Sequence, residues 1–129
     1  MTSRLLFVCV ENSNRSQMAE AFARLLGGHT VEAHSAGSRP SGVVNSKAVA
    51  AMAELGYDIS THRSKSLESL PSAQWDAVIM MGCGDACPSL PARLREDWAI
   101  PDPRDLSPEK FREVRDLVRD RVAALLPRL

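Results

Sequence analysis

A cysteine and an arginine six positions apart carry the first chemistry that this sequence suggests. Cys9 ends an apolar run, and Arg15 follows it in the segment CVENSNRS. A thiolate is a strong nucleophile, and a guanidinium binds a tetrahedral oxyanion through two parallel hydrogen bonds. The residues between them are enough to wrap backbone N–H groups around such an anion. The pattern therefore predicts a nucleophile at the base of an anion-binding loop.

The loop after Cys9 is expected to bind the anion along its whole length. A loop that enters a helix N-terminus exposes unpaired N–H groups, and the helix dipole strengthens their positive field. This field favours the thiolate form of Cys9, and Ser16 can donate its hydroxyl to that thiolate. Asparagine and serine suit tight loop conformations. The predicted substrate-binding residues are Val10, Glu11, Asn12, Ser13, Asn14 and Arg15.

The elements around this loop follow alternating strand and helix patterns. The predicted strands cover residues 4–10, 30–37, 76–82 and 95–100, the second at a sheet edge and the last one short. The predicted helices cover residues 13–26, 44–55 and a last segment with Ser107 as N-cap. Apolar residues recur at helical spacing in the first and last helices: Met18, Ala21, Phe22 and Leu25, then Phe111, Val114, Val118, Val122 and Leu125.

Such alternation predicts a parallel sheet covered on both sides, with ligands bound beyond the carboxyl ends of the strands. Cys9 ends the first strand, and Cys83 lies just past the third. If these strands are neighbours, the two thiols can meet at one sheet edge. A zinc site is the alternative for Cys83 and Cys87, but no second pair of Cys or His lies nearby at ligand spacing.

Size and charge limit the function further. The chain has 129 residues, which fits one domain over residues 1–129. Its 16 basic and 16 acidic residues balance, which argues against a nucleic-acid or membrane-surface partner. No apolar segment resembles a signal peptide or a membrane span, so we expect a cytoplasmic protein with reduced cysteines. We also expect a monomer.

Several segments together resemble the arsenate reductases built on the low-molecular-weight protein tyrosine phosphatase fold. They are FVCVENSNRSQMAEAF, HSAGS, and CGDACP followed by EDW and PDP. The resemblance covers nearly the whole chain. It implies a flavodoxin-like, three-layer α/β domain with a four-stranded parallel sheet in the order 2-1-3-4. It also implies reduction of arsenate to arsenite, with phosphate as a competing oxyanion.

The same resemblance assigns roles to individual residues. Cys9 would attack arsenate, Cys83 would release arsenite, and Cys87 would carry the disulfide to the surface. Asp102 in PDP would be the general acid that protonates the leaving oxygen. No bound cofactor or metal is expected. The reductant would be an external thiol, with thioredoxin as the first expectation and a low-molecular-weight thiol or glutaredoxin-like donor as the second.

Two positions depart from the pattern of the family. Glu11 stands where relatives usually have glycine, and its carboxylate would repel an anion, so we expect it to point outward. Some thioredoxin-coupled relatives bind potassium near the loop through an acidic side chain, and Lys65 takes that place here. Its ammonium is expected to substitute for the ion, with Asn12, Glu20 and Ser35 as neighbours.

Two other functions remain open at this stage. Cys9, Arg15 and Asp102 would suffice for a phosphomonoesterase, although DPRDLS offers no aromatic wall and two further thiols would be superfluous. A non-enzymatic oxyanion or arsenite binder would explain the thiols but leaves Asp102 without a role. Asp102 could also be a simple turn residue before a proline.

Overall fold

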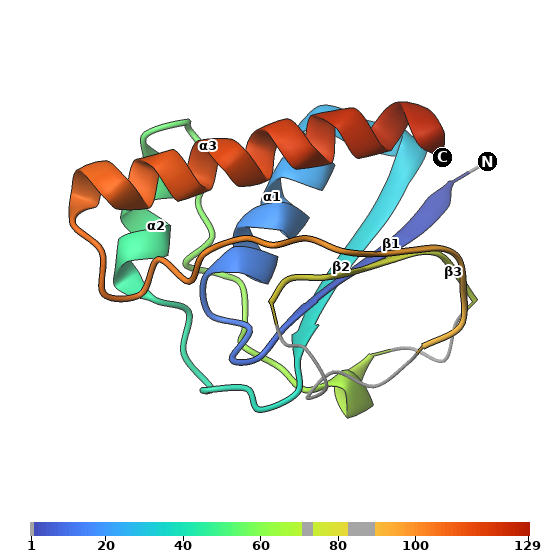
Figure 1. Cartoon of the computed structure of the whole chain (residues 1–129), viewed down its shortest axis with the longest axis horizontal. Coiled ribbons are helices and arrows are strands. Elements are labelled where there is room, and N and C mark those ends of the chain that lie inside the picture. Colours follow the sequence, from blue (N-terminus) through green and yellow to red (C-terminus); the bar gives the residue numbers. More distant parts are fainter. Residues whose placement is uncertain (1, 71–73, 83–89) are drawn as a thin grey trace.

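A four-stranded parallel sheet forms the centre of the computed structural model, which describes residues 2–70, 74–82 and 90–129 (Figure 1). The strands pair in the order β2-β1-β3-β4, and all neighbours are parallel. Their bounds are Ser3–Cys9 for β1, Val31–Gly37 for β2, Trp75–Met80 for β3 and Ala92–Asp97 for β4. The predicted order 2-1-3-4 is confirmed, and β2 is an edge strand as expected. Cys9 therefore ends an inner strand of the sheet.

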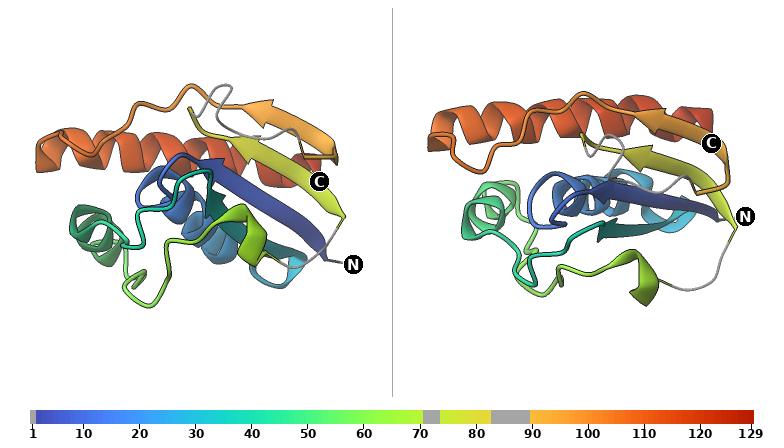
Figure 2. Two further views of the ribbon diagram at one scale, coloured as in Figure 1. Left: turned by 90° about the horizontal axis from the view of Figure 1, so that it is seen from below. Right: turned by 60° about the horizontal axis from the view of Figure 1, so that its bottom comes forward.

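Within the described residues, three α-helices pack on one face of this sheet: α1 (Arg15–Gly27), α2 (Ser46–Ala53) and α3 (Pro108–Leu125). Both views in Figure 2 show the short 3-10 helix η2 (Leu67–Ser69) on the other side of the sheet. Side chains of β1 alternate between these layers, because successive residues of a strand point to opposite faces. Leu5 and Phe7 join the helix-side core, whereas Leu6 and Val8 join the cluster beside η2.

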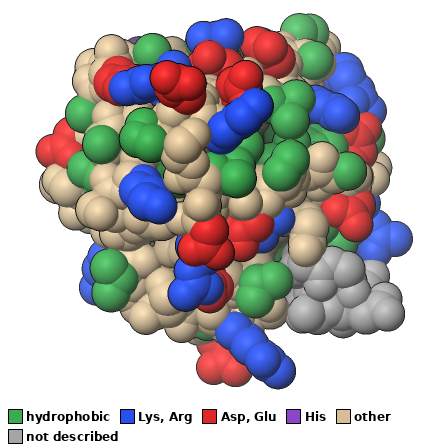
Figure 3. Space-filling model, turned by 60° about the vertical axis from the view of Figure 1, so that its left-hand side comes forward, with side chains coloured by type: hydrophobic (Ala, Val, Ile, Leu, Met, Phe, Trp, Pro, Cys, Tyr) green, Lys and Arg blue, Asp and Glu red, His purple; other side chains and the backbone are tan. Residues whose placement is uncertain are grey.

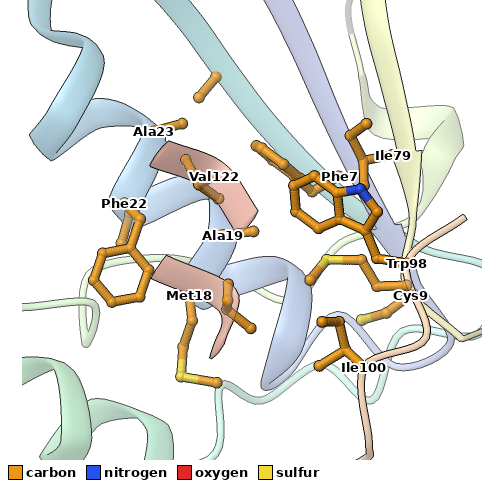
Figure 4. Packing of buried hydrophobic residues seen from close by; sticks show 14 of the residues in the cluster. Phe7, Cys9, Met18, Ala19, Phe22, Ala23, Ile79, Trp98, Ile100 and Val122 are labelled. Carbon is orange, nitrogen blue, oxygen red and sulfur yellow. The ribbon is translucent and has the colours of Figure 1, made fainter. Parts of the chain in front are cut away.

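The helix-side core extends to Cys9 at the end of β1. Figure 4 shows Phe7, Trp98 and Ile79 facing residues of α1 and α3, with Cys9 and Ile100 at the base of the same cluster. The rings of Phe7 and Trp98 lie 6.1 Å apart between centroids. Because this core is close-packed, the end of β1 and the backbone of Cys9 have little freedom to move.

Two predictions about the elements were inaccurate. The fourth strand covers Ala92–Asp97 instead of residues 95–100. Its side chains alternate between half-buried and exposed at the sheet edge, so its apolar signal is weak, whereas Trp98 and Ile100 beyond it turn into the core. Leu25 was predicted on the buried face of α1 but is 47% exposed, because the last turn of that helix extends beyond the core.

The surface carries charges of both signs side by side. On the face in Figure 3, acidic and basic side chains are interspersed with apolar ones, and no large patch of one sign is visible. No described helix combines the length and the apolar composition that crossing a membrane requires.

Helix α3 begins as the sequence predicted. Ser107 is its N-cap and accepts a hydrogen bond from the backbone N–H of Lys110 at 3.3 Å, and Pro108 occupies the first turn. All five apolar residues of the predicted stripe are buried: Phe111, Val114, Val118, Val122 and Leu125.

Replacing the cap tests this account of α3. Ser107→Ala removes the side-chain acceptor that caps the helix and should lower the free energy of unfolding by about 1 kcal/mol. In thermal unfolding this corresponds to a decrease in Tm of roughly 3–5 °C for a chain of this size. Ser107→Asp keeps an acceptor and should unfold like the wild type. Equal losses in both variants would show that capping is not the cause.

Candidate active site

The loop between β1 and α1 is held from one side by the segment after β2. The backbone carbonyls of Cys9, Val10 and Glu11 accept hydrogen bonds from the N–H groups of residues 38, 39 and 41, at 3.2, 2.8 and 3.1 Å. In a trans peptide the C=O and the next N–H point in opposite directions. The N–H groups that follow these carbonyls therefore face away from residues 38–41. Gly37 permits this approach, since a Cβ there would lie 2.6 Å from the Val10 oxygen.

A cavity of about 330 Å³ lies over this loop. It brings together residues from three separate parts of the chain, as the sequence predicted for Arg15 and Asp102. The lining residues are Cys9, Val10, Glu11, Ser13, Asn14, Arg15, Gly82 and Asp102. Asn12 is the one predicted loop residue that does not line the cavity. Its side chain is buried behind the loop instead and stabilises its shape.

Cys9 contacts a hydroxyl at the base of the cavity. Its Sγ lies 2.8 Å from Oγ of Ser16, which is fully buried. Ser16 Oγ also accepts a hydrogen bond from Nδ2 of Asn12 at 2.8 Å. A serine hydroxyl has one proton, and the amide of Asn12 already donates to its oxygen, so that proton is free to point at the sulfur. The predicted pairing of Ser16 with Cys9 is present.

Arg15 is fixed before any ligand arrives. The residue is 9% exposed, and Nη1 donates to the backbone oxygen of Ile100 at 3.1 Å. Gly82 packs directly against the guanidinium, and a Cβ at Gly82 would collide with Nη1. This glycine also has a φ of +84°, which side chains rarely tolerate. Fixing a long side chain in advance reduces the entropy that binding would otherwise cost.

Asp102 lies on the solvent side of the same cavity. Its side chain is 52% exposed, and Oδ2 is 3.9 Å from Nη2 of Arg15. Oδ1 accepts a hydrogen bond from the backbone N–H of Arg104 at 3.1 Å. The carboxyl group is thus held by its own turn and still faces the cavity and water, which is the position that a proton donor to a leaving oxygen needs.

Glu11 turns its side chain outward, as expected for a carboxylate in an anion loop. Its Oε1 lies 2.9 Å from Nη1 of Arg104. The partner itself was not identified from the sequence, because 93 positions separate the two residues.

Behind the loop lies a buried polar cluster centred on Glu20, which is 3% exposed. Its carboxylate accepts a hydrogen bond from Ser35 Oγ at 2.8 Å. Three nitrogen groups surround it: Arg24 Nη2 at 3.2 Å, His62 Nδ1 at 3.3 Å and Lys65 Nζ at 3.7 Å. Lys65 Nζ is also 3.3 Å from Ser35 Oγ. Glu20 and Ser35 are therefore neighbours of the Lys65 ammonium as predicted, whereas Asn12 accepts a hydrogen bond from the backbone N–H of Lys65 through its side-chain Oδ1.

Burial changes the protonation of this cluster. It lowers the pKa of the Lys65 ammonium below its usual range, while Glu20 opposes the shift. Burial also lowers the pKa of His62 and outweighs the attraction of Glu20. A neutral His62 can donate from Nδ1 to Oε1 of Gln17, 3.0 Å away. The contact between His62 and Glu20 is then a polar contact and not an ion pair.

Gln17 connects the cluster to the loop, and sequence reasoning missed it. Its side chain is fully buried, and its Nε2 donates to the backbone and side-chain oxygens of Asn12 at 3.1 and 3.0 Å. The same nitrogen lies 2.8 Å from the backbone oxygen of Arg63. A glutamine at a helix position next to apolar residues was the available signal, because a buried amide must find partners.

Two predicted site residues, Cys83 and Cys87, lie outside the described residues. In the part of the chain that the structure describes, no three His, Cys, Asp or Glu side chains are placed to hold a metal ion. The expected substitution of the Lys65 ammonium for a potassium ion fits this arrangement, because Nζ lies beside Glu20 and Ser35.

Comparisons with known proteins show which family the chain resembles in sequence and fold. A glutaredoxin arsenate reductase from Synechocystis sp. is 40% identical over 129 residues, which is 98% of each chain. A solved arsenate reductase in the phosphate binding state superposes with a TM-score of 0.87 at 39% identity, over 98% of each chain. A low molecular weight protein tyrosine phosphatase from T. tengcongensis has a TM-score of 0.82 at 28% identity, over 99% of this chain and all of that one. Residues 4–129 match the family model of the low molecular weight phosphotyrosine protein phosphatases. The chain therefore belongs to the low molecular weight phosphotyrosine protein phosphatase family, as a relative of its arsenate reductases.

Proposed function

We propose that this protein reduces arsenate to arsenite with electrons from an external thiol. The observation that carries the proposal is the position of Cys9, whose sulfur meets a hydroxyl at the base of a cavity lined by an anion loop, Arg15 and Asp102. The arsenate reductases to which the chain is similar support the choice of oxyanion.

Arsenate and phosphate are tetrahedral oxyanions that still carry one hydroxyl group as dianions. The loop N–H groups and the guanidinium of Arg15 would bind the bare oxygens.

The first chemical step would form a bond between sulfur and arsenic. The thiolate of Cys9, stabilised by the hydroxyl of Ser16, attacks arsenic(V). Asp102 gives its proton to a departing oxygen, which leaves as water. Arsenic remains in the +5 state in this adduct, so a second thiol is needed: when the two thiols form a disulfide, the electron pair of the sulfur–arsenic bond stays on arsenic.

The second thiol would be Cys83, which directly follows the cavity residue Gly82 in the chain. Its thiolate attacks the sulfur of Cys9, a disulfide forms, and arsenic leaves as arsenite with two more electrons. Cys87 then attacks Cys83, which frees Cys9 and produces a Cys83–Cys87 disulfide. A donor dithiol reduces this disulfide and completes the cycle. The proposed donor is thioredoxin, with a glutaredoxin or a low-molecular-weight thiol as the second candidate.

Phosphomonoester hydrolysis is the second candidate function, because the family includes phosphatases such as the one from T. tengcongensis. Cys9, Arg15 and Asp102 would suffice for a cysteinyl-phosphate mechanism. None of the described cavity-lining residues is aromatic, so the site offers no wall for a phenyl ring. We therefore expect weak hydrolysis of an aryl phosphate beside efficient reduction of arsenate.

The proposed function predicts arsenate-dependent oxidation of NADPH in a coupled assay. One arm contains thioredoxin and its reductase, and the other contains glutaredoxin, glutathione and glutathione reductase. Cys9→Ser should abolish the signal in whichever arm supports the wild type, and should also abolish hydrolysis of p-nitrophenyl phosphate. Circular dichroism should show an intact fold. Appreciable arsenate reduction by Cys9→Ser would contradict the mechanism.

The proposed relay predicts where the disulfide stands after a single turnover. Reduced wild-type protein, given arsenate without a donor and then alkylated, should yield a Cys83–Cys87 linkage in peptide mapping. Cys87→Ala should stop at Cys9–Cys83. If the wild type itself stops at Cys9–Cys83 and Cys87→Ala turns over normally with a donor, Cys87 takes no part.

The ammonium of Lys65 predicts an activity that does not depend on potassium. It already faces Glu20 and Ser35, so a monovalent cation would add nothing there. Arsenate reduction should be equal in potassium and sodium salts at one ionic strength. Lys65→Met removes a positive charge beside the buried carboxylate of Glu20 and should lower kcat/KM. Lys110→Met removes an exposed charge on α3 and should leave kcat/KM unchanged. Specific activation of the wild type by potassium would refute this role.

A further inference from the structure

An exposed ion pair joins the anion loop to the turn that carries Asp102. Glu11 Oε1 and Arg104 Nη1 lie 2.9 Å apart, and their side chains are 38% and 58% exposed. Exposed pairs contribute little to the stability of a fold, because water and salt screen them. Any effect of this pair is therefore expected at the site and not in global unfolding.

Arg104 is held at three points. Its guanidinium contacts Glu11, its backbone N–H donates to Oδ1 of Asp102 at 3.1 Å, and its carbonyl accepts from Nζ of Lys47 at 3.0 Å. Lys47 belongs to the first turn of α2. Arg104 thus links the loop after β1, the carboxylate of Asp102 and helix α2. The direct contact between Asp102 Oδ2 and Arg15 Nη2 is longer than these three, at 3.9 Å.

The negative charge of Glu11 would weaken the binding of an anion by the loop. Glu11 lines the cavity in which a dianion would sit, and although its carboxylate turns outward to the rim, an unpaired negative charge this close would still repel the ligand. The guanidinium of Arg104 cancels that charge at contact distance. Arg104 itself does not line the cavity, so it would act through Glu11 and Asp102 and not by touching the ligand.

We propose that Arg104 is a positioning residue that neutralises Glu11 at the rim of the anion site and holds the Asp102 turn against the loop. The inference rests on the proposed function, since it takes the loop to bind a tetrahedral oxyanion. It makes two separable claims: the charge cancellation governs binding of the anion, and the link itself governs the rate of the chemical step.

The binding claim is tested with inorganic phosphate by titration calorimetry at low ionic strength. Arg104→Gln exposes the charge of Glu11 and should raise Kd for phosphate about three- to tenfold, less at high salt. Glu11→Gln leaves Arg104 unpaired and should lower Kd. The double variant has neither charge and should return close to the wild type. Arg119→Gln on α3 removes the same charge far from the loop and is the matched control.

The rate claim is tested by measuring kcat in the wild type, the two single variants and the double variant. The ion pair is absent from Arg104→Gln, Glu11→Gln and the double variant alike, so kcat for arsenate reduction should fall in all three, even where phosphate binding is restored. A purely structural role would not separate Kd from kcat in this way. Tm should stay near the wild-type value in every variant.

Some results would contradict the role of Arg104 alone, and another would contradict the proposed function as well. If the wild type binds phosphate but Arg104→Gln binds it as tightly as Arg119→Gln does, the inference is wrong. It is also wrong if the weakened binding of Arg104→Gln is not relieved by adding Glu11→Gln, or if kcat is unchanged in all three variants. If the wild type does not bind phosphate at all, the proposed function fails and this inference fails with it.

Discussion

The site depends on the buried amide of Asn12. This residue has a φ of +52° and no exposed surface, and it sits where the loop reverses direction. Its Oδ1 accepts from the backbone of Lys65 and from Gln17, and its Nδ2 donates to Ser16. One side chain therefore fixes the loop, ties it to a distant segment and turns a hydroxyl toward the thiol of Cys9. Glycine would tolerate the backbone conformation equally well, but it would supply none of these bonds.

The polar layer behind Asn12 explains how a loop can be so well fixed. A buried carboxylate such as Glu20 is costly unless its charge and its lone pairs are satisfied. Ser35, Arg24 and Lys65 satisfy them here. The buried side of the loop is thus supported by hydrogen bonds and charge contacts. Its solvent side is held by the exposed ion pair between Glu11 and Arg104.

Patterns within single segments of the sequence predicted those features of the structure that depend on one segment alone. The apolar run of β1, the helical stripe of α3 and the spacing from Cys9 to Arg15 each lie within one segment, so periodicity and spacing were enough. The strand order came from the resemblance to a family. β4 was misplaced because an edge strand buries few side chains. Contacts such as Gln17 with Arg63 or Glu11 with Arg104 depend on how segments 46 and 93 positions apart meet, and no local pattern encodes that.

The central claim is that the loop places Cys9 directly beneath a bound oxyanion held by Arg15. Alkylation of Cys9 by iodoacetamide, followed by mapping of its peptide, tests this claim without any turnover. In the wild type, inorganic phosphate should protect Cys9 in a saturable way. Arg15→Lys keeps the charge but loses the bidentate geometry, and should need about tenfold more phosphate for the same protection, which corresponds to about 1.4 kcal/mol. If phosphate leaves the alkylation rate of Cys9 unchanged in the wild type, the loop is not the anion site.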